Sequence, residues 1–419
     1  MPKSAFQALS LDEAVLFGQF YRINLTPVFF VETLADLEKK VREGRTPEDV
    51  VGTIARKTGN LTADPCVHHE RLVLRNLLGY EVLMDGRPHV QGGRSVGTGE
   101  KEGLVFEQSR EAEALGRWQQ GRFLDIERDI AREWRERLKS QRLGKMDLSR
   151  VFQDGRRPRS LLEAKEYGDW FVRQRRGAFL ASLNVLGVPP LHRGRIFQRW
   201  LECGAPSIAE LAPYAAYVAS VMTFFQVAVA ADLISGERAS NSADIAYLFY
   251  LPFCMVFTSN DHLHVKTAPL FLRRDQAFVL GTDIKADLRK LDAYFSAQPA
   301  EVLDRGVMCF DLPFDDGYLT VRLRRRFLPG WRPHRPEDVK VAPAKEAVLV
   351  REFRAAEASP AIPDIDMANA DFVIMKRVFP ETLGKWRIIS HDVAERGRAA
   401  ERARRNAAPP GSQGSINSD

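Results

Sequence analysis

Residues 240–261 read SNSADIAYLFYLPFCMVFTSND, and the other predicted elements are arranged around this stretch. Asp244 lies where a helix is expected to begin, the apolar run 245–257 is strand-like, and Asp261 follows its end. Ligands of open α/β sheets bind outside the carboxyl ends of the strands, so we expect Asp261 to line a crevice that Asp244 faces. Two carboxylates that meet in this way repel each other unless a cation joins them. The stretch therefore predicts half of a magnesium-type site.

Composition and charge place the chain among globular proteins with a large core. Of its 419 residues, 45% are hydrophobic and 28% are charged, and 61 Lys and Arg residues stand against 55 Asp and Glu residues, a net charge of +6. This length allows one large domain or two to three ordinary ones. The pI near 9.1 favours a polyanionic partner without requiring one.

The cysteines and the first residues bear on the compartment. Cys66, Cys203, Cys254 and Cys309 have no paired spacing, which favours free thiols over a disulfide framework. The first residues lack the apolar core and the small-residue cleavage site of a signal peptide. We therefore expect a reducing, cytoplasmic location.

The apolar run 212–234 is long enough to cross a bilayer and contains one charge, Asp232. Its many alanines, the lack of clustered Lys or Arg close by and the strand-like segment that follows favour a buried central helix over a membrane span. Asp232 is then expected to face solvent or to cap the helix. No stable membrane insertion is predicted.

Two further acidic positions occur near the N-terminus. Either a short strand ends at Asp12, or Ser10 and Glu13 form a capping box that starts a helix. Both hold if a strand over 5–11 turns directly into a helix over 12–21, and Asp12 then lies at this junction. The attraction between an acid and the dipole of a helix N-terminus explains Asp12 equally well.

A second strand is predicted over 25–31, followed by a helix that carries Glu32 and Asp36 on one face, one turn apart. Acids on such a helix are commonly solvated. Asp36 therefore becomes a candidate ligand only if the fold brings it to Asp244 and Asp261.

Arginines between positions 191 and 200 give the best candidate contact for phosphate groups. This segment is basic with interleaved aromatic residues, and Arg193, Arg195 and Arg199 are predicted to bind nucleic acid. Two weaker motifs are interpreted as ordinary structure. The cluster at 66–70 (CVHHE) lacks a partner pair at zinc spacing and predicts a helix start, and the glycine-rich 91–99 lacks the ending of a phosphate-binding loop.

Taken together, the acidic positions resemble the order found in PIN-type nucleases. The likeness rests on Leu11-Asp12, on 31–37 (VETLADL), on Asp244 and on 257–261 (FTSND). It implies an α/β fold with a three-layer parallel sheet flanked by helices. It also implies that acids at the strand ends bind Mg²⁺ or Mn²⁺ and hydrolyse phosphodiester bonds.

Residue by residue, the resemblance gives Asp12 the first acidic position, Asp36 the second, Asp244 the third and Asp261 the fourth. Glu is commoner at the second position. Asn260 occupies the place where the fourth acid usually stands, so it is an additional or alternative ligand. The family usually shows Asp-Thr-Asn at its first acid, whereas this chain has Asp12-Glu-Ala.

The resemblance also implies a domain organisation and a partner. The core would be discontinuous, formed by 1–45 and 205–295, with a largely helical insertion over 46–204, a C-terminal α/β extension over 296–393 and a disordered tail over 394–419. The expected partner is nucleic acid, RNA rather than DNA, with a second copy of the chain or an inhibitor protein as further partners. The alternative is a catalytically inactive module that binds nucleic acid or protein, which the missing Thr and Asn after Asp12 support.

Overall fold

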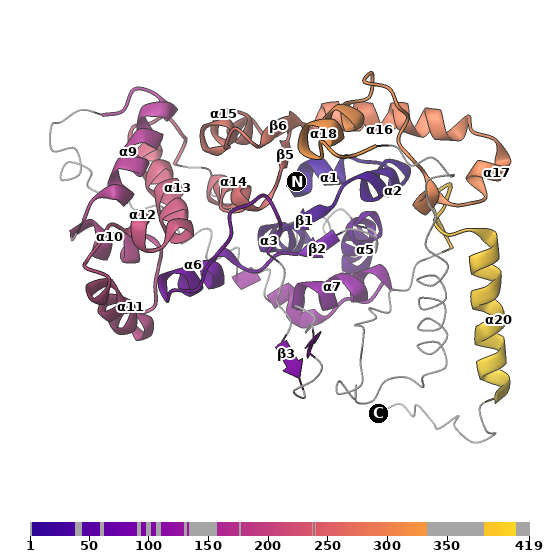
Figure 1. Cartoon of the computed structure of the whole chain (residues 1–419), viewed down its shortest axis with the longest axis horizontal. Helices are drawn as coiled ribbons and strands as arrows, with labels where there is room; N and C mark the ends of the chain where they lie inside the picture. Colours follow the sequence, from indigo (N-terminus) through magenta and orange to yellow (C-terminus); the bar gives the residue numbers. More distant parts are fainter. Residues whose placement is uncertain are drawn as a thin grey trace.

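The structure is a computed structural model, and helices predominate in the part of the chain that it describes. The description covers residues 2–37, 44–58, 63–89, 94–97, 102–105, 110–129, 132–133, 157–175, 177–236, 238, 240–332 and 381–407. A helical group lies at the left of Figure 1, short parallel strands lie near the centre, and further helices lie at the right.

The helical group is built on α13 (Pro213–Ala230), which is apolar around its whole circumference. It packs against α9 (Leu161–Arg173) and α6 (His69–Leu77), and α10 (Gly177–Val185), α11 (Pro190–Glu202) and α12 (Ile208–Leu211) complete the group (Figure 1). Gly168 lets α9 approach α13 closely, since a Cβ at this position would lie 2.5 Å from the Ser220 carbonyl oxygen.

The predicted buried helix over 212–234 is therefore confirmed in its main part. By length and composition α13 is the one described helix that could cross a membrane, and 67% of it is buried inside the protein. The side chain of Asp232, just beyond its end, is 88% exposed, as expected.

A second core contains the N-terminal helices α1 (Lys3–Gln7), α2 (Leu11–Phe20) and α3 (Pro27–Ala35). Into it also pack α5 (Pro47–Lys57), α7 (Arg110–Gln119), α16 (Gly281–Ser296) and α18 (Leu319–Phe327). The short helix α17 (Ala300–Leu303) and the 3-10 turn η3 (Val307–Cys309) follow α16. Both cores include residues from the segment 46–204, and the predicted domain boundaries remain a prediction.

Strands occur in pairs. β1 (Ile23–Leu25) and β2 (Ala63–Pro65) are parallel, as are β5 (Val256–Ser259) and β6 (Ala277–Leu280). The pairs β3 (Arg94–Gly97) with β4 (Glu102–Val105) and β7 (Thr382–Leu383) with β8 (Trp386–Arg387) are antiparallel. Within the described ranges no sheet exceeds two strands, and the three-layer PIN-like fold stays a prediction.

Two N-terminal segments that were expected to be strands are helices. Residues 5–11 contain the end of α1, and the run 25–31 leaves β1 at Leu25 and continues as α3. Pro27 at the first position of α3 has the backbone angle that a helix start requires, which explains the early end of the strand. The predicted capping box of Ser10 and Glu13 is confirmed at the start of α2.

The run 245–257 also differs from the expected single strand. It is divided into α14 (Ser240–Leu248), the 3-10 turn η2 (Leu251–Phe253) around Pro252, and β5. Burial on all sides makes a short apolar helix resemble a strand in sequence. Helix α15 (His262–Phe271) then follows β5 directly.

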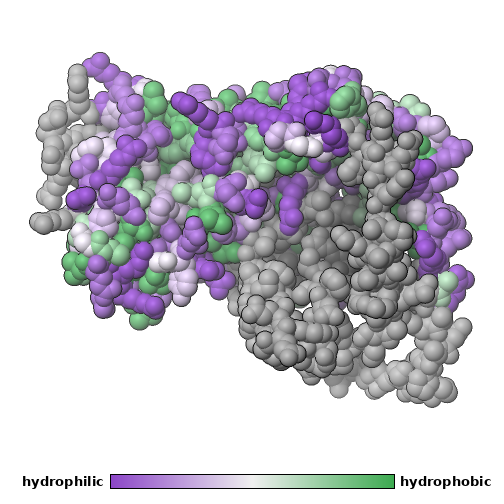
Figure 2. Space-filling view, viewed as in Figure 1, coloured by the Kyte–Doolittle hydropathy of each residue, from purple (hydrophilic) through white to green (hydrophobic). Residues whose placement is uncertain are grey.

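Towards the C-terminus, residues 317–323 (GYLTVRL) have the β-branched and aromatic residues typical of a strand, but most of them are in helix α18. The tail expected to be disordered from position 394 contains helix α20 (His391–Ala407). The glycine-rich loop is described only over 94–97. Residues 333–380, about half of the expected C-terminal extension, lie outside the described residues, and this part includes the strand-like run 347–350 (AVLV). Hydrophilic residues cover much of the visible surface in Figure 2, with scattered apolar patches between them.

Candidate acidic site

Asp244 and Asp261 come from the beginning and the end of the segment 240–261. Asp244 lies on the first turns of α14, and Asp261 is the N-cap of α15 immediately after β5. One carboxylate oxygen of Asp261 accepts hydrogen bonds from the backbone N–H groups of Leu263 (2.7 Å) and His264 (3.2 Å). Asp261 therefore follows a strand, as expected, although the strand is short and leads directly into a helix.

Glu32 joins this pair from α3. The hydroxyl of Tyr247 on α14 donates a 2.5 Å hydrogen bond to the Glu32 carboxylate, and the same hydroxyl oxygen accepts a bond from the Lys3 backbone N–H (3.3 Å). The Lys3 ammonium, almost fully buried, donates to the Glu32 carbonyl oxygen and pairs with Asp36. Three segments far apart in sequence thus meet at one place.

His264 ties the two aspartates together through buried hydrogen bonds. Its Nε2 lies 2.6 Å from the Asp244 carbonyl oxygen, which can only accept, so Nε2 must carry the proton. In the neutral ring, Nδ1 then accepts from the Ser259 hydroxyl (2.9 Å), whose oxygen in turn accepts from the Asp261 backbone N–H (3.0 Å). Burial lowers the pKa of His264, which favours this neutral form.

The carboxylates of the site disfavour one another's charge. Burial raises the pKa of Asp244 to about 7, and the charges of Asp261 and Glu32 add to this effect. The pKa of Glu32 is raised by burial and by Asp36 and Asp261, against the hydrogen bond from Tyr247 and the charge of Lys3. Burial and mutual repulsion therefore favour the neutral, protonated forms of Asp244 and Glu32.

These carboxylates offer oxygen ligands, which Mg²⁺ and Mn²⁺ prefer. In this conformation, however, no three His, Cys, Asp or Glu side chains of the described residues converge closely enough to hold one metal ion. The donor chemistry fits a hard divalent cation, and direct ligation by three of the acids would require side-chain movement or bridging water.

The remaining predicted ligands have other partners. Asp12, in the first turn of α2, accepts a 2.9 Å hydrogen bond from the Lys385 backbone N–H in the β7–β8 hairpin. The side chain of Asn260 accepts from the Thr282 backbone N–H at the start of α16 (2.9 Å). Of Asn260 and Asp261, it is Asp261 whose charge acts on Asp244 and Glu32.

The predicted phosphate contacts lie on α11, and two of the three arginines serve the fold. Arg193 donates to the Val188 carbonyl and the Asn184 side chain, and Arg199 donates to the carbonyl oxygens of Leu77 and Leu211. Arg195 is exposed and makes no hydrogen bond or ion pair with the described part of the chain.

Glu32 belongs to the acidic motif in the sequence, but Asp36 was predicted as the ligand in its place. The signal was present, because Glu is the commoner residue at the second acidic position of the resembled family and Glu32 lies one turn before Asp36. Nothing local in the sequence identifies Lys3, Tyr247 or His264, since their roles depend on contacts between distant segments.

Comparison of the chain with protein-family models, with curated proteins and with solved structures gives no match.

Proposed function

We propose that the chain is a divalent-metal-dependent nuclease with a PIN-like arrangement of acids. It would act on single-stranded nucleic acid, with RNA preferred over DNA. The observation that supports this most is the meeting of Glu32, Asp244 and Asp261, which come from three elements. Burial, and then the charges of neighbouring acids, raise the pKa values of Glu32 and Asp244. Placing like charges together costs folding free energy. A cation that joined them would offset that cost.

In this proposal, Glu32, Asp244 and Asp261 hold Mg²⁺ or Mn²⁺, with Asp36 alongside. When bound, the ion would activate a water molecule and stabilise the charge that develops on the phosphate. The chain's own groups set the geometry. Tyr247 orients Glu32, and His264 fixes the backbone beside Asp244 while Ser259 fixes that of Asp261.

Cleavage of an end-labelled single-stranded RNA with Mg²⁺ or Mn²⁺, compared with an excess of chelator, tests the proposal. Asp244→Asn should reduce the cleavage rate at least 100-fold, on the scale of losing electrostatic stabilisation of the transition state. Asp304→Asn, a change of the same kind at an exposed position after α17, is the matched control and should keep wild-type activity.

A readout without turnover accompanies this assay. Mn²⁺ should raise the melting temperature of the wild-type protein and of Asp304→Asn, but have much less effect on Asp244→Asn. Wild-type protein that neither cleaves RNA or DNA nor gains stability from Mn²⁺ would contradict the proposal.

The second candidate is the catalytically inactive binding module. It is favoured by one observation, that no three candidate ligands among the described residues converge on a single ion position. This module would bind single-stranded RNA without cleaving it. Its affinity would be the same for wild type and Asp244→Asn, with or without chelator.

A further inference from the structure

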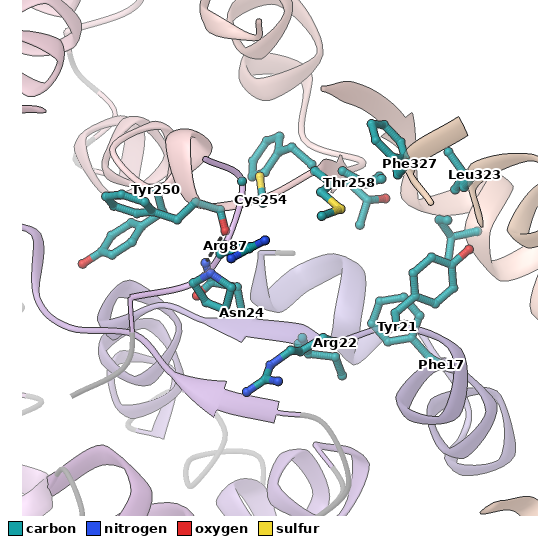
Figure 3. A pocket seen from close by; sticks show the side chains of 18 of the residues that line it. Phe17, Tyr21, Arg22, Asn24, Arg87, Tyr250, Cys254, Thr258, Leu323 and Phe327 are labelled. Atoms are coloured by element: carbon teal, nitrogen blue, oxygen red, sulfur yellow. Dashed lines mark hydrogen bonds between the residues drawn. The ribbon is translucent and has the colours of Figure 1, made fainter. Parts of the chain in front are cut away.

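A cavity of about 420 Å³ separates the two parallel strand pairs, and its volume falls in the range of small-molecule sites. Figure 3 shows Arg22 and Asn24 on the β1 side, Cys254 and Thr258 on the β5 side, and Phe17, Tyr21 and Phe327 towards one end. The edges of β1 and β5 that face this cavity are not paired with each other. The two strand pairs are thus held apart by a space that can accept a ligand.

The walls of this cavity are mostly apolar and include many aromatic side chains. Phe17 and Tyr21, whose rings lie 4.9 Å apart, come from α2 and the residue after it, and Phe327 ends α18. Phe253 and Phe257 add rings from η2 and β5. Such walls suit a flat ring, because stacking on aromatic side chains accepts any planar heterocycle.

Three buried polar atoms, on residues that line the cavity, have no hydrogen-bond partner among the described residues. They are the hydroxyl oxygens of Thr26 and Thr258, both on residues only 5% exposed, and the amide oxygen of Asn24. The amide nitrogen of Asn24 is used, since it donates to the Phe253 carbonyl (3.3 Å). Buried polar atoms are rarely left unpaired, because losing water without a replacement bond is costly.

The hydroxyl of Thr26 is the clearest of these unpaired atoms. Thr26 is the N-cap residue of α3, a position where a threonine side chain normally accepts a hydrogen bond from the first turn. Here it makes no such bond. Together with Thr258, which can donate or accept, and the accepting Asn24, it offers the mixed hydrogen-bonding pattern that matches a heterocycle bearing both donors and acceptors.

A second, basic cavity of about 340 Å³ adjoins the first and shares part of its lining with it. Arg273 there is paired with Asp275, and Arg326 donates to the Gln276 carbonyl (3.0 Å). The exposed Arg274 makes no ion pair or side-chain hydrogen bond with the described residues, so its guanidinium can receive an anion. The carboxylate of Asp85 also lines this cavity.

We propose that the joined cavities bind a nucleotide, with the base between the aromatic side chains and the phosphate at Arg274 and Arg326. Thr26, Thr258 and Asn24 would hydrogen-bond the edge of the base. A free nucleotide and one unit of a single-stranded nucleic acid share this chemistry. The site differs from the acidic cluster, although Tyr247 lines the cavity and bonds to Glu32, and Phe257 of the cavity wall packs against His264. The inference does not require the protein to be a nuclease.

Calorimetric titration of the full chain with the four common ribonucleoside 5′-monophosphates tests the site, in the presence of a chelator so that no cleavage occurs. Parallel titrations use adenosine, inorganic phosphate and single-stranded pentanucleotides of RNA and DNA. At least one monophosphate or one pentanucleotide should bind, and adenosine and phosphate should each bind more weakly than AMP. Binding of monophosphates identifies a free nucleotide as the ligand, and binding of pentanucleotides alone identifies a strand.

Two variants locate the binding. Thr258→Val keeps the shape and the β-branching of the side chain and should weaken binding about five- to tenfold, the worth of one hydrogen bond. Arg274→Ala removes an exposed side chain and should weaken binding of AMP but not of adenosine. Arg305→Ala, which changes an exposed arginine just after α17, is the matched control.

Asp244→Asn should leave nucleotide affinity unchanged, which separates this site from the proposed nuclease site. The inference is overturned if no nucleotide or pentanucleotide binds at millimolar concentration. It is equally overturned if Thr258→Val and Arg274→Ala both bind as tightly as wild type.

Discussion

Glu32 and Asp36 lie one turn apart on α3, yet their surroundings differ. Glu32 accepts a hydrogen bond from the buried Tyr247, and its charge acts on Asp244. The Asp36 side chain is 46% exposed and is paired with Lys3. An acid whose charge is already offset has less to contribute to a cation. The acidic site therefore depends more on Glu32 than on the residue that the sequence pattern selected.

Glu32→Gln and Asp12→Asn discriminate between the structural grouping and the sequence-based one. Glu32→Gln should lower metal-dependent cleavage at least 100-fold, because it removes a charge from the cluster. Asp12→Asn should retain far more activity, since Asp12 is bonded to the β7–β8 hairpin. Cleavage rates on the same labelled RNA give the comparison. Equal losses in the two variants would restore Asp12 to the site.

His69 should make the protein less stable in mild acid. Burial, and to a smaller extent the charge of His68, lower the pKa of His69 to about 4, and its ring packs 4.7 Å from that of Phe249. Between pH 6.5 and 4 the unfolded chain binds a proton at this position that the folded chain does not. The free energy of unfolding therefore falls as the pH decreases through this window, by at most about 1.4 kcal/mol per pH unit.

His69→Phe keeps an aromatic ring at this position and removes the titration. Urea denaturation at pH 7.5 and pH 5 should show a loss of stability that is about 1–2 kcal/mol smaller for this variant than for wild type. His391→Phe, an exposed histidine at the start of α20, serves as control. An unchanged pH dependence in His69→Phe would show that other groups cause the acid sensitivity.

At the level of elements, α18 shows how a distant residue can decide a helix start. Its N-cap residue, Tyr318, makes no side-chain cap. Instead, the buried carboxylate of Asp287 on α16 accepts hydrogen bonds from the backbone N–H groups of Leu319 (2.6 Å) and Thr320 (2.8 Å) and from the Thr320 hydroxyl (2.6 Å). One side chain from another element thus satisfies the first turn of α18.

Asp287→Ala should destabilise the protein by about 2–4 kcal/mol, because charge-assisted hydrogen bonds are lost and the donors remain buried. Hydrogen exchange should become faster first at the backbone amides of α18. Asp283→Ala, at an exposed position of α16, is the control and should change the stability by less than about 0.5 kcal/mol. Protection of α18 that persists in Asp287→Ala would contradict this role.

The sequence could predict the elements whose signals are local. The capping box of Ser10 and Glu13 and the apolar length of α13 both appear in the structure where they were expected. It could not predict the state of 317–323, because β-branched and aromatic residues favour a strand there, whereas the cap that satisfies the helix start comes from Asp287 on another element. The apolar run 245–257 was misjudged since complete burial hides helical periodicity.

The residues of the acidic site were likewise predictable only where their signals are local. Asp244 and Asp261 could be selected because each lies near an element end that the sequence marks. Glu32 could have been chosen from its place in the acidic motif. Asp12 was selected because a strand was expected to end there, but the structure has helix α1 before it. Its carboxylate instead accepts a hydrogen bond from the Lys385 backbone, in a hairpin more than 370 positions later.

For the whole molecule, the two cores are joined by polar contacts as well as by chain connections. Tyr247 belongs to the first core and bonds to Glu32 and Lys3, and Asn24 bonds to the Phe253 carbonyl across the strand pairs. Loss of one core should therefore disrupt these contacts and weaken the other. We expect the cores to unfold together.

Phe224→Ala in the first core and Phe29→Ala in the second test this coupling. Both side chains are fully buried, and each change should cost about 3–5 kcal/mol. Thermal unfolding followed by circular dichroism and by intrinsic fluorescence should show one transition, lowered in both variants. Two resolved transitions, of which each variant shifts only one, would show that the cores are independent.

The buried contact of Lys3 also limits when the acidic site can assemble during synthesis of the chain. Its backbone N–H bonds to Tyr247, a residue that the ribosome adds 244 positions later. Until α14 has been synthesised, Lys3 and Glu32 cannot bond to Tyr247. The carboxylates of Asp244 and Asp261 are also not yet all present. Contacts so distant in sequence form late in folding. A nascent chain released before position 261 would carry a large part of the protein but none of its assembled acidic site.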